Sequence, residues 1–394
     1  MSTAVGLAER GETDVCVLDA GEPGAGASGR NGGFVFAGYS LDNDSLISQL
    51  GEQRARTLHG WTREAVRLIR DRIDRHGIDC QVNDAGVLLA DWFGDDDRLF
   101  EFARRMREHL GFQLDPVDRS AMAAHVVSPR YGAGLHEPAS FHFHPLRHIV
   151  GLAGVIERAG GAVLAQSPVR AIERINGHWR LRCEGGEVQA DEVVLATGGY
   201  DRSLYPPVQR ALQPVATYIA VTEPLGGLIE ELLPRPVAVY DTRFAFDYYR
   251  PLPDTRLLWG GRISMAARSP KAIRRLMARD IRRVFPGLAG IRFEHAWGGW
   301  MSYARHQMPL LGQRPDGLWH ALAFGGHGMA TTTLAGEMMA EALTGDRHRL
   351  DVFRRWPASW AGGPVGRAVV QGHYWMSQVR DWMREHRAGR KHPV

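Results

Sequence analysis

The sequence predicts an α/β fold with a parallel sheet, joined to a discontinuous α+β domain built on an antiparallel sheet. The chain opens with a helical run at residues 2–11, followed by an apolar strand at residues 14–19. Residues 193–196 are all apolar without alternation, which is typical of a parallel strand buried on both faces. Strand-like and helical runs mix between these segments, and the strands in the middle of the chain predict the second domain.

The first predicted strand ends at an acid. In a dinucleotide-binding unit, strand one leads through a glycine turn into a helix, and an acid ending strand two bonds the ribose. Asp19 holds that second position, before Gly21, Pro23 and Gly24. The alternative is a strand-end acid facing water. The strand and glycine turn that should come before residues 2–11 are absent, for which a wrongly assigned start codon is the simplest explanation and a real truncation the other.

A glycine-rich stretch follows Asp19. Residues 24–29 spell G-x-G-x-x-G, but Arg30, Asn31, Gly32 and Gly33 come next. A nucleotide fingerprint needs a regular helix after its glycines, and each interior Gly costs a helix about 1 kcal/mol relative to Ala. We therefore interpret residues 24–33 as a loop whose backbone amides approach a ligand, with polar contacts from Arg30 and Asn31.

The remaining elements alternate in type. Helical runs are predicted near residues 46–76, 95–110 and 270–284, and strand-like runs near 81–92, 214–222, 236–250 and 256–263. The apolar positions of residues 46–76 have helical spacing, which indicates packing rather than a cofactor site.

Composition fits a cytoplasmic globular enzyme. The 394 residues, 44% of them hydrophobic, can form two domains. Cys16, Cys80 and Cys183 lie far apart, so neither a disulfide framework nor a zinc knuckle is indicated. No apolar run of about 18 residues or secretory leader is present. The formal charge of +4 is mild and spread along the chain, so nucleic acid is not an expected partner.

Four segments, in order, resemble the D-amino-acid oxidase and glycine oxidase superfamily, whose FAD-dependent members oxidise C–N bonds. They are residues 19–33, residues 134–146 with His144-Pro145-Leu146, residues 190–199, and residues 309–312 with 323–337. The resemblance reaches to about residue 345. Residues 222–225, 247–250 and 259–262 are most similar to the gamma-glutamylputrescine oxidoreductase-like branch.

The resemblance implies a Rossmann-like FAD-binding domain of the glycine oxidase and glutathione-reductase type. It would comprise residues 1–80, 130–205 and 300–345, truncated at its N-terminus. The substrate domain would comprise residues 81–129 and 206–299. A helical tail would follow at residues 346–394.

The resemblance also implies where FAD binds. The cofactor-binding candidates are Asp19, Ala27, Ser28, Gly29, Arg30, Asn31, Gly32, Gly33, Val169, Thr197, Gly198, Gly325, Gly326, His327, Gly328 and Met329. Free N–H groups before a helix at residues 332–343 could face a flavin oxygen or a phosphate, unless Thr331 or Thr332 caps an ordinary turn. His327 could touch the cofactor or bond to backbone instead.

The resemblance also implies that FAD is non-covalent. The sarcosine-oxidase-like branch attaches its flavin to a Cys shortly before the closing motif, and residues 297–301 contain no Cys. A metal is not expected either: His142 and His144 share a strand face, but no third ligand lies near in sequence.

For this family the expected reaction is oxidation of an amine or amino acid to an imine, by hydride transfer to flavin N5, followed by hydrolysis. Oxygen or a quinone would reoxidise the flavin. Relatives hold a substrate carboxylate with Arg and Tyr, and the catalytic candidates are Tyr249, Arg305 and His306. Side chains alternate along a strand, so Tyr249 points to one face and Tyr248 and Arg250 to the other, and they cannot all line the pocket. For each arginine, the alternative to substrate binding is a surface or structural ion pair. A nicotinamide-dependent dehydrogenase and a cofactor-free remnant are the other functional alternatives.

The tail predicts an amphipathic helix. An apolar stripe is formed by Trp375, Met376, Val379, Trp382 and Met383. We expect it to dock on the protein's own surface or on a second subunit, giving a homo-oligomer. A peripheral membrane contact is the second alternative.

Overall fold

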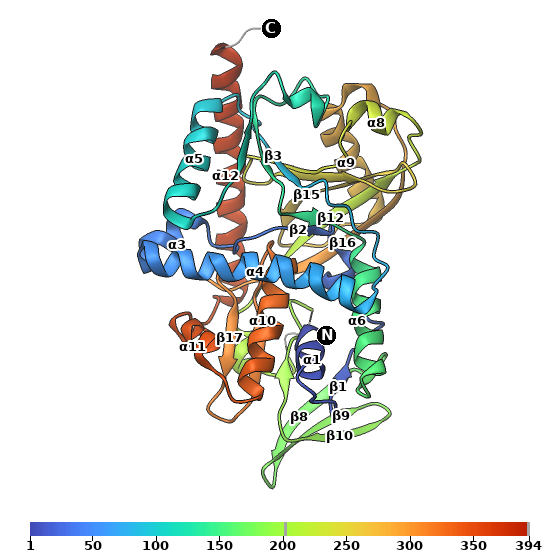
Figure 1. The fold of residues 1–394 in the computed structure, drawn as a ribbon, viewed down its shortest axis with the longest axis vertical. Helices are drawn as coiled ribbons and strands as arrows, with labels where there is room; N and C mark the ends of the chain where they lie inside the picture. The colour runs from blue at the N-terminus through green and yellow to red at the C-terminus, as the bar shows by residue number, and fades with distance from the viewer. Residues whose placement is uncertain (201–202, 392–394) are drawn as a thin grey trace.

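The computed structural model describes residues 1–200 and 203–391. A large mixed sheet occupies the upper half of the molecule in Figure 1 and a divided parallel sheet the lower half. Helix α4 (Glu52–His76) crosses the front between them. The mixed α/β class predicted from the sequence is confirmed.

The parallel sheet is divided into two parts. β1 (Cys16–Leu18) pairs in parallel with β7 (Ala162–Leu164). β11 (Val194–Leu195) pairs in parallel with β18 (Trp319–Leu322), which pairs antiparallel with β17 (Leu310–Gln313). Within the described residues no ladder joins β1 to β11. The expectation that residues 193–196 are buried on both faces is wrong, since Val194 is half-buried and Ala196 exposed.

Four helices pack together beside this sheet. α1 (Ser2–Ala8) approaches α10 (Gly328–Leu343) closely, because a Cβ on Gly336 would lie 2.4 Å from the Cβ of Ser2. Arg72 of α4 joins both helices, with its Nη2 2.6 Å from carboxylate oxygens of Glu9 and Glu337. α6 (Pro145–Arg158) completes this group around one hydrophobic core.

The predicted helix at residues 46–76 is interrupted. α3 (Asn43–Leu50) and α4 meet at Gly51, whose φ of 77° belongs to the left-handed region. That conformation suits glycine and ends the first helix.

The large sheet has eight strands. In spatial order they are β16 (Phe293–Tyr303), β12 (Gln213–Thr222), β15 (Leu257–Ser264), β14 (Asp247–Pro251), β13 (Ala238–Asp241), β3 (Val87–Ala90), β5 (Gly134–Glu137) and β4 (Asp115–Val117). Only the β13–β3 pair among these ladders is parallel. The run predicted at residues 236–250 is two strands, β13 and β14, and β5 lies in this sheet although residues 130–205 were assigned to the FAD-binding domain.

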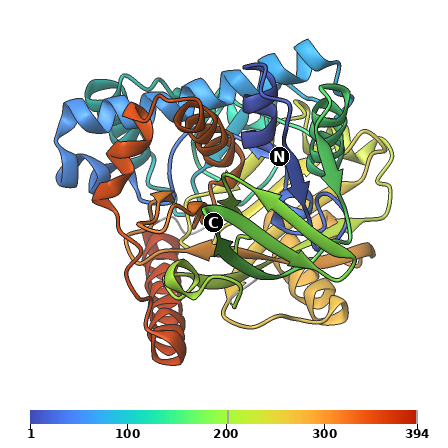
Figure 2. The same ribbon diagram turned by 90° about the horizontal axis from the view of Figure 1, so that it is seen from below.

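Smaller elements surround the two sheet systems. The three-stranded antiparallel sheet of β8 (Val169–Ile175), β9 (His178–Cys183) and β10 (Gly186–Ala190) lies at the lower end, in front in Figure 2. The others are α2 (Ala27–Arg30), β2 (Phe34–Val35), α5 (Asp96–Leu110), β6 (Phe141–His142), α7 (Pro206–Gln209), α8 (Leu228–Leu232), α9 (Pro270–Val284), α11 (His348–Asp351) and the 3-10 turns Met122–Ala124, Pro286–Leu288 and Val352–Arg355.

The tail ends in α12 (Gly363–Lys391), which runs up one side of the molecule in Figure 1. Its apolar stripe is exposed, with Trp375 63% and Trp382 58% accessible. Docking of this stripe on the protein's own surface is therefore wrong; Tyr374 and Ser377, on the other side of the helix, are buried. Among the described residues we find no helix with the length and apolarity needed to cross a membrane.

Candidate active site

A cavity of about 2250 Å³ lies between the two sheet systems. Its wall includes β1, the loop at residues 24–32, the end of β11, the start of α10 and strands of the large sheet. Small-molecule pockets usually measure about 300–1,000 Å³. This cavity therefore has room for a dinucleotide and a substrate together.

The loop on one side of the cavity is held by its own hydrogen bonds. After the single helical turn of α2, the Asn31 amide donates to the carbonyls of Ala27 (3.1 Å) and Ser28 (2.8 Å) and accepts from the Gly33 N–H (2.8 Å). A Cβ on Gly29 would lie 2.3 Å from the Gly24 oxygen. The chain thus leaves the helical conformation after Arg30, in agreement with the interpretation of residues 24–33 as a loop.

Arg250 fastens this loop to the large sheet. Its side chain, 3% exposed on β14, donates to the Gly32 carbonyl at 2.6 Å and to the Phe143 carbonyl at 2.9 Å. Burial lowers the pKa of Arg250 to about 10. Gly33 fits beneath it with a φ of 79°, and a Cβ there would lie 2.0 Å from the Phe143 oxygen. Arg250 therefore supports the loop and does not reach the cavity.

On another side of the cavity, α10 begins at Gly328, earlier than predicted. No side chain of the described residues caps its N-terminus. Thr331 and Thr332 donate instead to the carbonyls of His327 (2.5 Å) and Met329 (3.3 Å), so the threonine cap considered from the sequence is not formed. The first-turn N–H groups remain available to a ligand in the cavity.

Ser40 sets the turn that leads into α10. Its hydroxyl accepts from the Gly326 N–H at 3.0 Å and donates to the Phe324 carbonyl at 3.1 Å. Gly325 has a φ of 59°, and a Cβ there would lie 2.2 Å from the Ser40 hydroxyl oxygen. This turn therefore requires glycine at position 325.

Three buried polar atoms of the cavity wall have no hydrogen-bond partner among the described residues. They are Nδ1 of His148, Nδ1 of His327 and the hydroxyl of Thr197. Burial lowers the pKa of His327 to about 4, so the ring is neutral. An unpaired buried polar group costs about 1–3 kcal/mol, and a polar ligand in the cavity would remove that cost.

Most predicted cofactor residues meet at this cavity. Those that line it are Asp19, Ala27, Ser28, Arg30, Asn31, Gly32, Val169, Thr197, Gly198, Gly325, Gly326, His327, Gly328 and Met329. Gly29 and Gly33 lie behind the wall, at the close contacts described above. The uncapped helix start, the three unpartnered atoms and the size of the cavity fit a flavin dinucleotide. Among the described residues, no cluster of three or more His, Cys, Asp or Glu side chains could hold a metal ion.

The catalytic candidates are less well grouped. Arg305 is exposed and lines the cavity. Tyr249 is fully buried and stacks on Trp259, with ring centroids 4.5 Å apart. His306 accepts from the Met308 N–H at 3.2 Å and is not part of the wall. Because side chains alternate along β14, Tyr248 points into the cavity and replaces Tyr249 as the candidate.

Sequence reasoning missed an aromatic wall in front of α10. The ring of Phe36 stacks on that of Tyr240, with centroids 5.7 Å apart, and its centroid lies 5.0 Å from that of His327. The ring centroids of Tyr240 and Phe246 are 5.7 Å apart, and those of Phe246 and Tyr248 are 6.2 Å apart. Burial raises the pKa of Tyr248 to about 12, so its hydroxyl keeps its proton. Alternation within the strands was the only available signal for these residues, and it does not say which face meets the cavity.

The first half of α12 was also missed as part of the site. Gly366, Val369, Val370, His373 and Tyr374 all line the cavity. Gln213 of β12 donates to the Ala361 carbonyl at 2.6 Å, and Gln371 accepts from the Met265 N–H at 3.2 Å. The tail is thereby held against the large sheet as one side of the cavity.

Comparison with known proteins agrees with this geometry. The model of the FAD dependent oxidoreductase family, DAO, matches residues 1–342. Gamma-glutamylputrescine oxidoreductase of Escherichia coli K12 is 34% identical over 359 residues, covering 91% of this chain and 84% of that protein. The probable oxidoreductase OrdL of Haemophilus influenzae is 32% identical over 359 residues, covering 90% and 82%.

Solved structures show the same fold. Glycine oxidase from Bacillus cereus ATCC 14579 has a TM-score of 0.73 at 18% identity, covering 89% of this chain and 94% of that one. L-proline dehydrogenase from P. horikoshii has a TM-score of 0.74 at 17% identity, covering 90% and 94%. The family match names the cofactor class that the cavity fits, and the chain belongs to the DAO family of FAD-dependent oxidoreductases.

Proposed function

We propose that this chain oxidises the C–N bond of an amine or amino acid to an imine, which water then hydrolyses to a carbonyl compound. The observation that carries the proposal is the position of the uncapped α10 start and His327 beside the aromatic wall of the large sheet. FAD, held non-covalently there, supplies the two-electron acceptor for the substrate hydride. The names of the relatives, which mention gamma-glutamylputrescine, glycine and L-proline, support this substrate class.

Different residues of the cavity would position the cofactor and the substrate. First-turn N–H groups of α10 and the neutral His327 would hold the cofactor, and Asp19 at the end of β1 would accept from its ribose. Tyr240, Phe246 and Tyr248 would exclude water and stack on the substrate. Arg305, exposed at the cavity, would pair with a substrate carboxylate.

A second candidate is a polypeptide that does not retain FAD. It is favoured by the division of the parallel sheet, because β1 and β11 both border the cavity and no ladder joins them in the described residues. A strand between them would pair with both edges and carry a phosphate-binding turn. The family match assigns FAD, and thereby displaces the nicotinamide-dependent dehydrogenase considered from the sequence.

An absorbance spectrum between about 300 and 550 nm tests the proposal. This chain and a version extended upstream are purified with added FAD. Flavin bands in this chain support the proposal, and bands only in the extended protein support the second candidate. Bands in neither protein would contradict FAD binding.

The flavin-containing protein is then mixed anaerobically with a panel of amines and amino acids. Bleaching by none of them would contradict the proposed reaction. Peroxide formation in air, compared with reduction of an added quinone, distinguishes the two acceptors.

A further inference from the structure

Helix α12 docks on the protein through one side, which carries its acidic residues. The Asp381 carboxylate accepts from the Phe244 N–H at 2.8 Å. Glu385 lies 2.7 Å from Nη2 of Arg283 and 3.1 Å from Nη2 of Arg130. Both acids of the helix are therefore used in docking.

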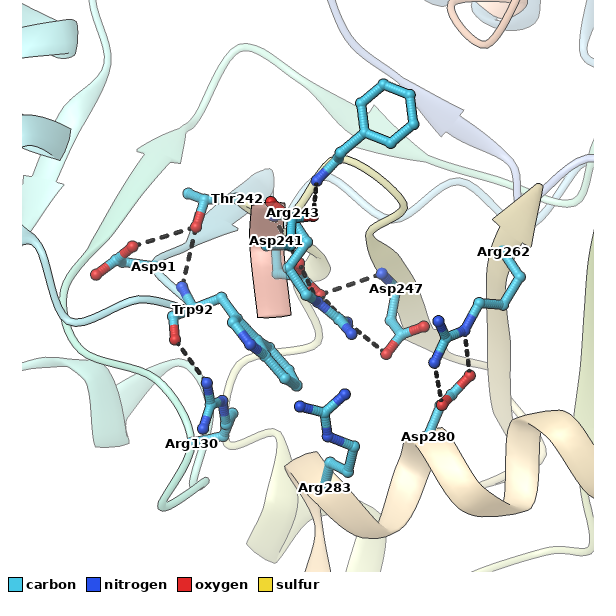
Figure 3. A network of polar contacts seen from close by, with 12 residues as sticks. Asp91, Trp92, Arg130, Asp241, Thr242, Arg243, Asp247, Arg262, Asp280 and Arg283 are labelled. Atoms are coloured by element: carbon cyan, nitrogen blue, oxygen red, sulfur yellow. Dashed lines mark hydrogen bonds and ion pairs between the residues drawn. The ribbon is translucent and has the colours of Figure 1, made fainter. Parts of the chain in front are cut away.

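Glu385 meets a cationic cluster, which explains why this side faces inward. Arg243, Arg130 and Arg283 surround the indole of Trp92, with guanidinium carbons 3.6, 4.0 and 4.7 Å from the ring (Figure 3). Arg243 is neutralised by Asp241 and Asp247, at 2.6 and 2.5 Å. The single carboxylate of Glu385 pairs with the other two arginines, and these ion pairs set the orientation of α12 about its axis.

The opposite side of α12, here called the outer face, is apolar and exposed. Its large side chains are between 41% and 63% accessible, and they are Trp375, Met376, Val379, Trp382 and Met383. At about 100° per residue they fall within an arc about 120° wide, and they extend for about 12 Å along the axis. Five large apolar side chains side by side form a larger patch than the singly scattered surface residues of a typical monomer.

Charge on the outer face has one sign. His373, Arg380 and Arg387 are exposed along one border of the arc. The two acids of residues 363–387 are both on the docking side, as described above. Over residues 363–387, the outer face thus combines tryptophans, aliphatic side chains and arginines, and neither acid of the helix lies on it.

We propose that the outer face of α12 binds an anionic membrane surface, with the helix lying parallel to the bilayer. Helices of this composition bury their apolar face at the boundary between headgroups and acyl chains. Trp375 and Trp382 suit that depth, because indole rings concentrate at membrane interfaces. Arg380 and Arg387 would meet the anionic headgroups.

A second copy of the chain is the other occupant to consider. The spacing of Met376, Val379 and Met383 is compatible with helix pairing. Trp375 and Trp382 make the apolar face wider than the narrow contact stripe of a paired helix. In a dimer of this face, the bordering arginines would also find no acid on the same face of the partner copy. The charges therefore favour anionic lipid.

Vesicle sedimentation with the full chain tests the proposal. Vesicles contain phosphatidylcholine alone or phosphatidylcholine with phosphatidylglycerol, each at low and high salt. We expect binding to the anionic vesicles at low salt, weakened at high salt. The Trp375→Ser/Trp382→Ser variant should lose this binding, and Arg380→Gln/Arg387→Gln should weaken partitioning about 30-fold, at about fivefold per arginine.

Controls separate lipid binding from folding and from self-association. Arg54→Gln/Arg67→Gln removes two exposed arginines of α4 and should bind as the parent does. Circular dichroism melts check that each variant is folded. If the tryptophan variant unfolds, vesicle binding by the Arg380→Gln/Arg387→Gln variant decides whether the proposal holds. Absence of vesicle binding overturns the proposal, as does equal binding to both lipids. A dimer in sedimentation equilibrium that the tryptophan variant dissociates, without vesicle binding, assigns the face to a second copy instead.

Discussion

At the scale of single residues, Gly325 and Gly326 shape the wall in front of α10. Because a Cβ on Gly325 would lie 2.2 Å from the Ser40 hydroxyl, Gly325→Ala should displace the turn and lower FAD occupancy. Gly326→Leu should lower FAD occupancy because the added side chain would fill part of the cavity. Asp19→Ala should weaken FAD binding about 10- to 100-fold, as expected for one hydrogen bond to a charged group. Flavin content per protein, measured by absorbance in a protein that retains FAD, checks these changes.

A matched control is Gly185→Ala. A Cβ at this hairpin position meets nothing within 4 Å. This variant should keep its full flavin content. Unchanged flavin content in all three site variants would contradict the placement of the cofactor.

Arg305 allows a test of substrate recognition. Its guanidinium is exposed at the cavity, so Arg305→Gln should raise KM for amino acids at least about tenfold, as loss of a charged hydrogen bond predicts. Amines without a carboxylate should be oxidised with nearly unchanged KM, and Arg305→Lys should restore part of the affinity. An equal loss for both substrate types would assign Arg305 to the structure of the cavity instead.

His59 should make stability depend on pH. Burial lowers its pKa from 6.5 to about 4, and neither ring nitrogen has a partner in the described structure. As pH falls below 6.5, the unfolded chain takes up the proton first, so stability is lost between pH 6.5 and about 4. The full effect is about 3 kcal/mol. His59→Leu should therefore reduce the drop in Tm between pH 8 and pH 5, whereas His295→Leu, at an exposed position, should not.

The residues of the site show what a sequence can reveal. Asp19, Arg30 and Gly325 were predictable because a strand end and glycine-rich turns mark places where backbone meets ligand. The choice between Tyr248 and Tyr249 could not be predicted, because alternation along a strand separates two faces without saying which face meets the cavity. Phe36 and Ser40 carry no local signal, since their role depends on α10, almost 300 residues later in the chain.

At the scale of elements, Arg250 joins β14 to the loop at residues 24–33. Arg250→Gln should leave the carbonyls of Gly32 and Phe143 without their donors, costing about 2–4 kcal/mol in the free energy of unfolding. FAD occupancy should fall as well, because the loop loses its support. Urea denaturation and flavin absorbance measure the two effects.

Arg256 provides the comparison for that variant. It forms an exposed ion pair with Glu294 at 2.8 Å, and exposed pairs contribute about 0–1 kcal/mol. Arg256→Gln should therefore have a small effect. Equal losses in the two variants would contradict a special role for Arg250.

Elements differ in how well local sequence predicts them. The helix expected at residues 270–284 agrees with α9, and the strand at 214–222 agrees with β12 to one residue. Residues 236–250 form two strands because a turn that includes Phe244 and Ala245 reverses the chain. The exposed stripe of α12 could not be predicted, since the cationic cluster that orients the helix comes from Arg130, Arg243 and Arg283, which are distant in sequence.

At the scale of the whole molecule, the discontinuous architecture followed from the order of strands and helices together with family resemblance. The division of the parallel sheet is the global feature with the clearest physical consequence. In a parallel strand, N–H groups point alternately to the two sides. β1 has a partner on the β7 side and β11 on the β18 side, and both strands line the cavity.

Amide hydrogen exchange should reveal this division. Residues 16–19 and 193–196 should exchange quickly in this chain, because half of their N–H groups face the cavity rather than a neighbouring strand. β12, which has partners on both sides in the eight-stranded sheet, should exchange most slowly. If a strand supplied in an upstream extension pairs with both edges, these segments should become protected to a similar degree as β12. Strong protection of both segments in the present chain would show that the two edges are already paired, and would remove the case for a polypeptide that does not retain FAD.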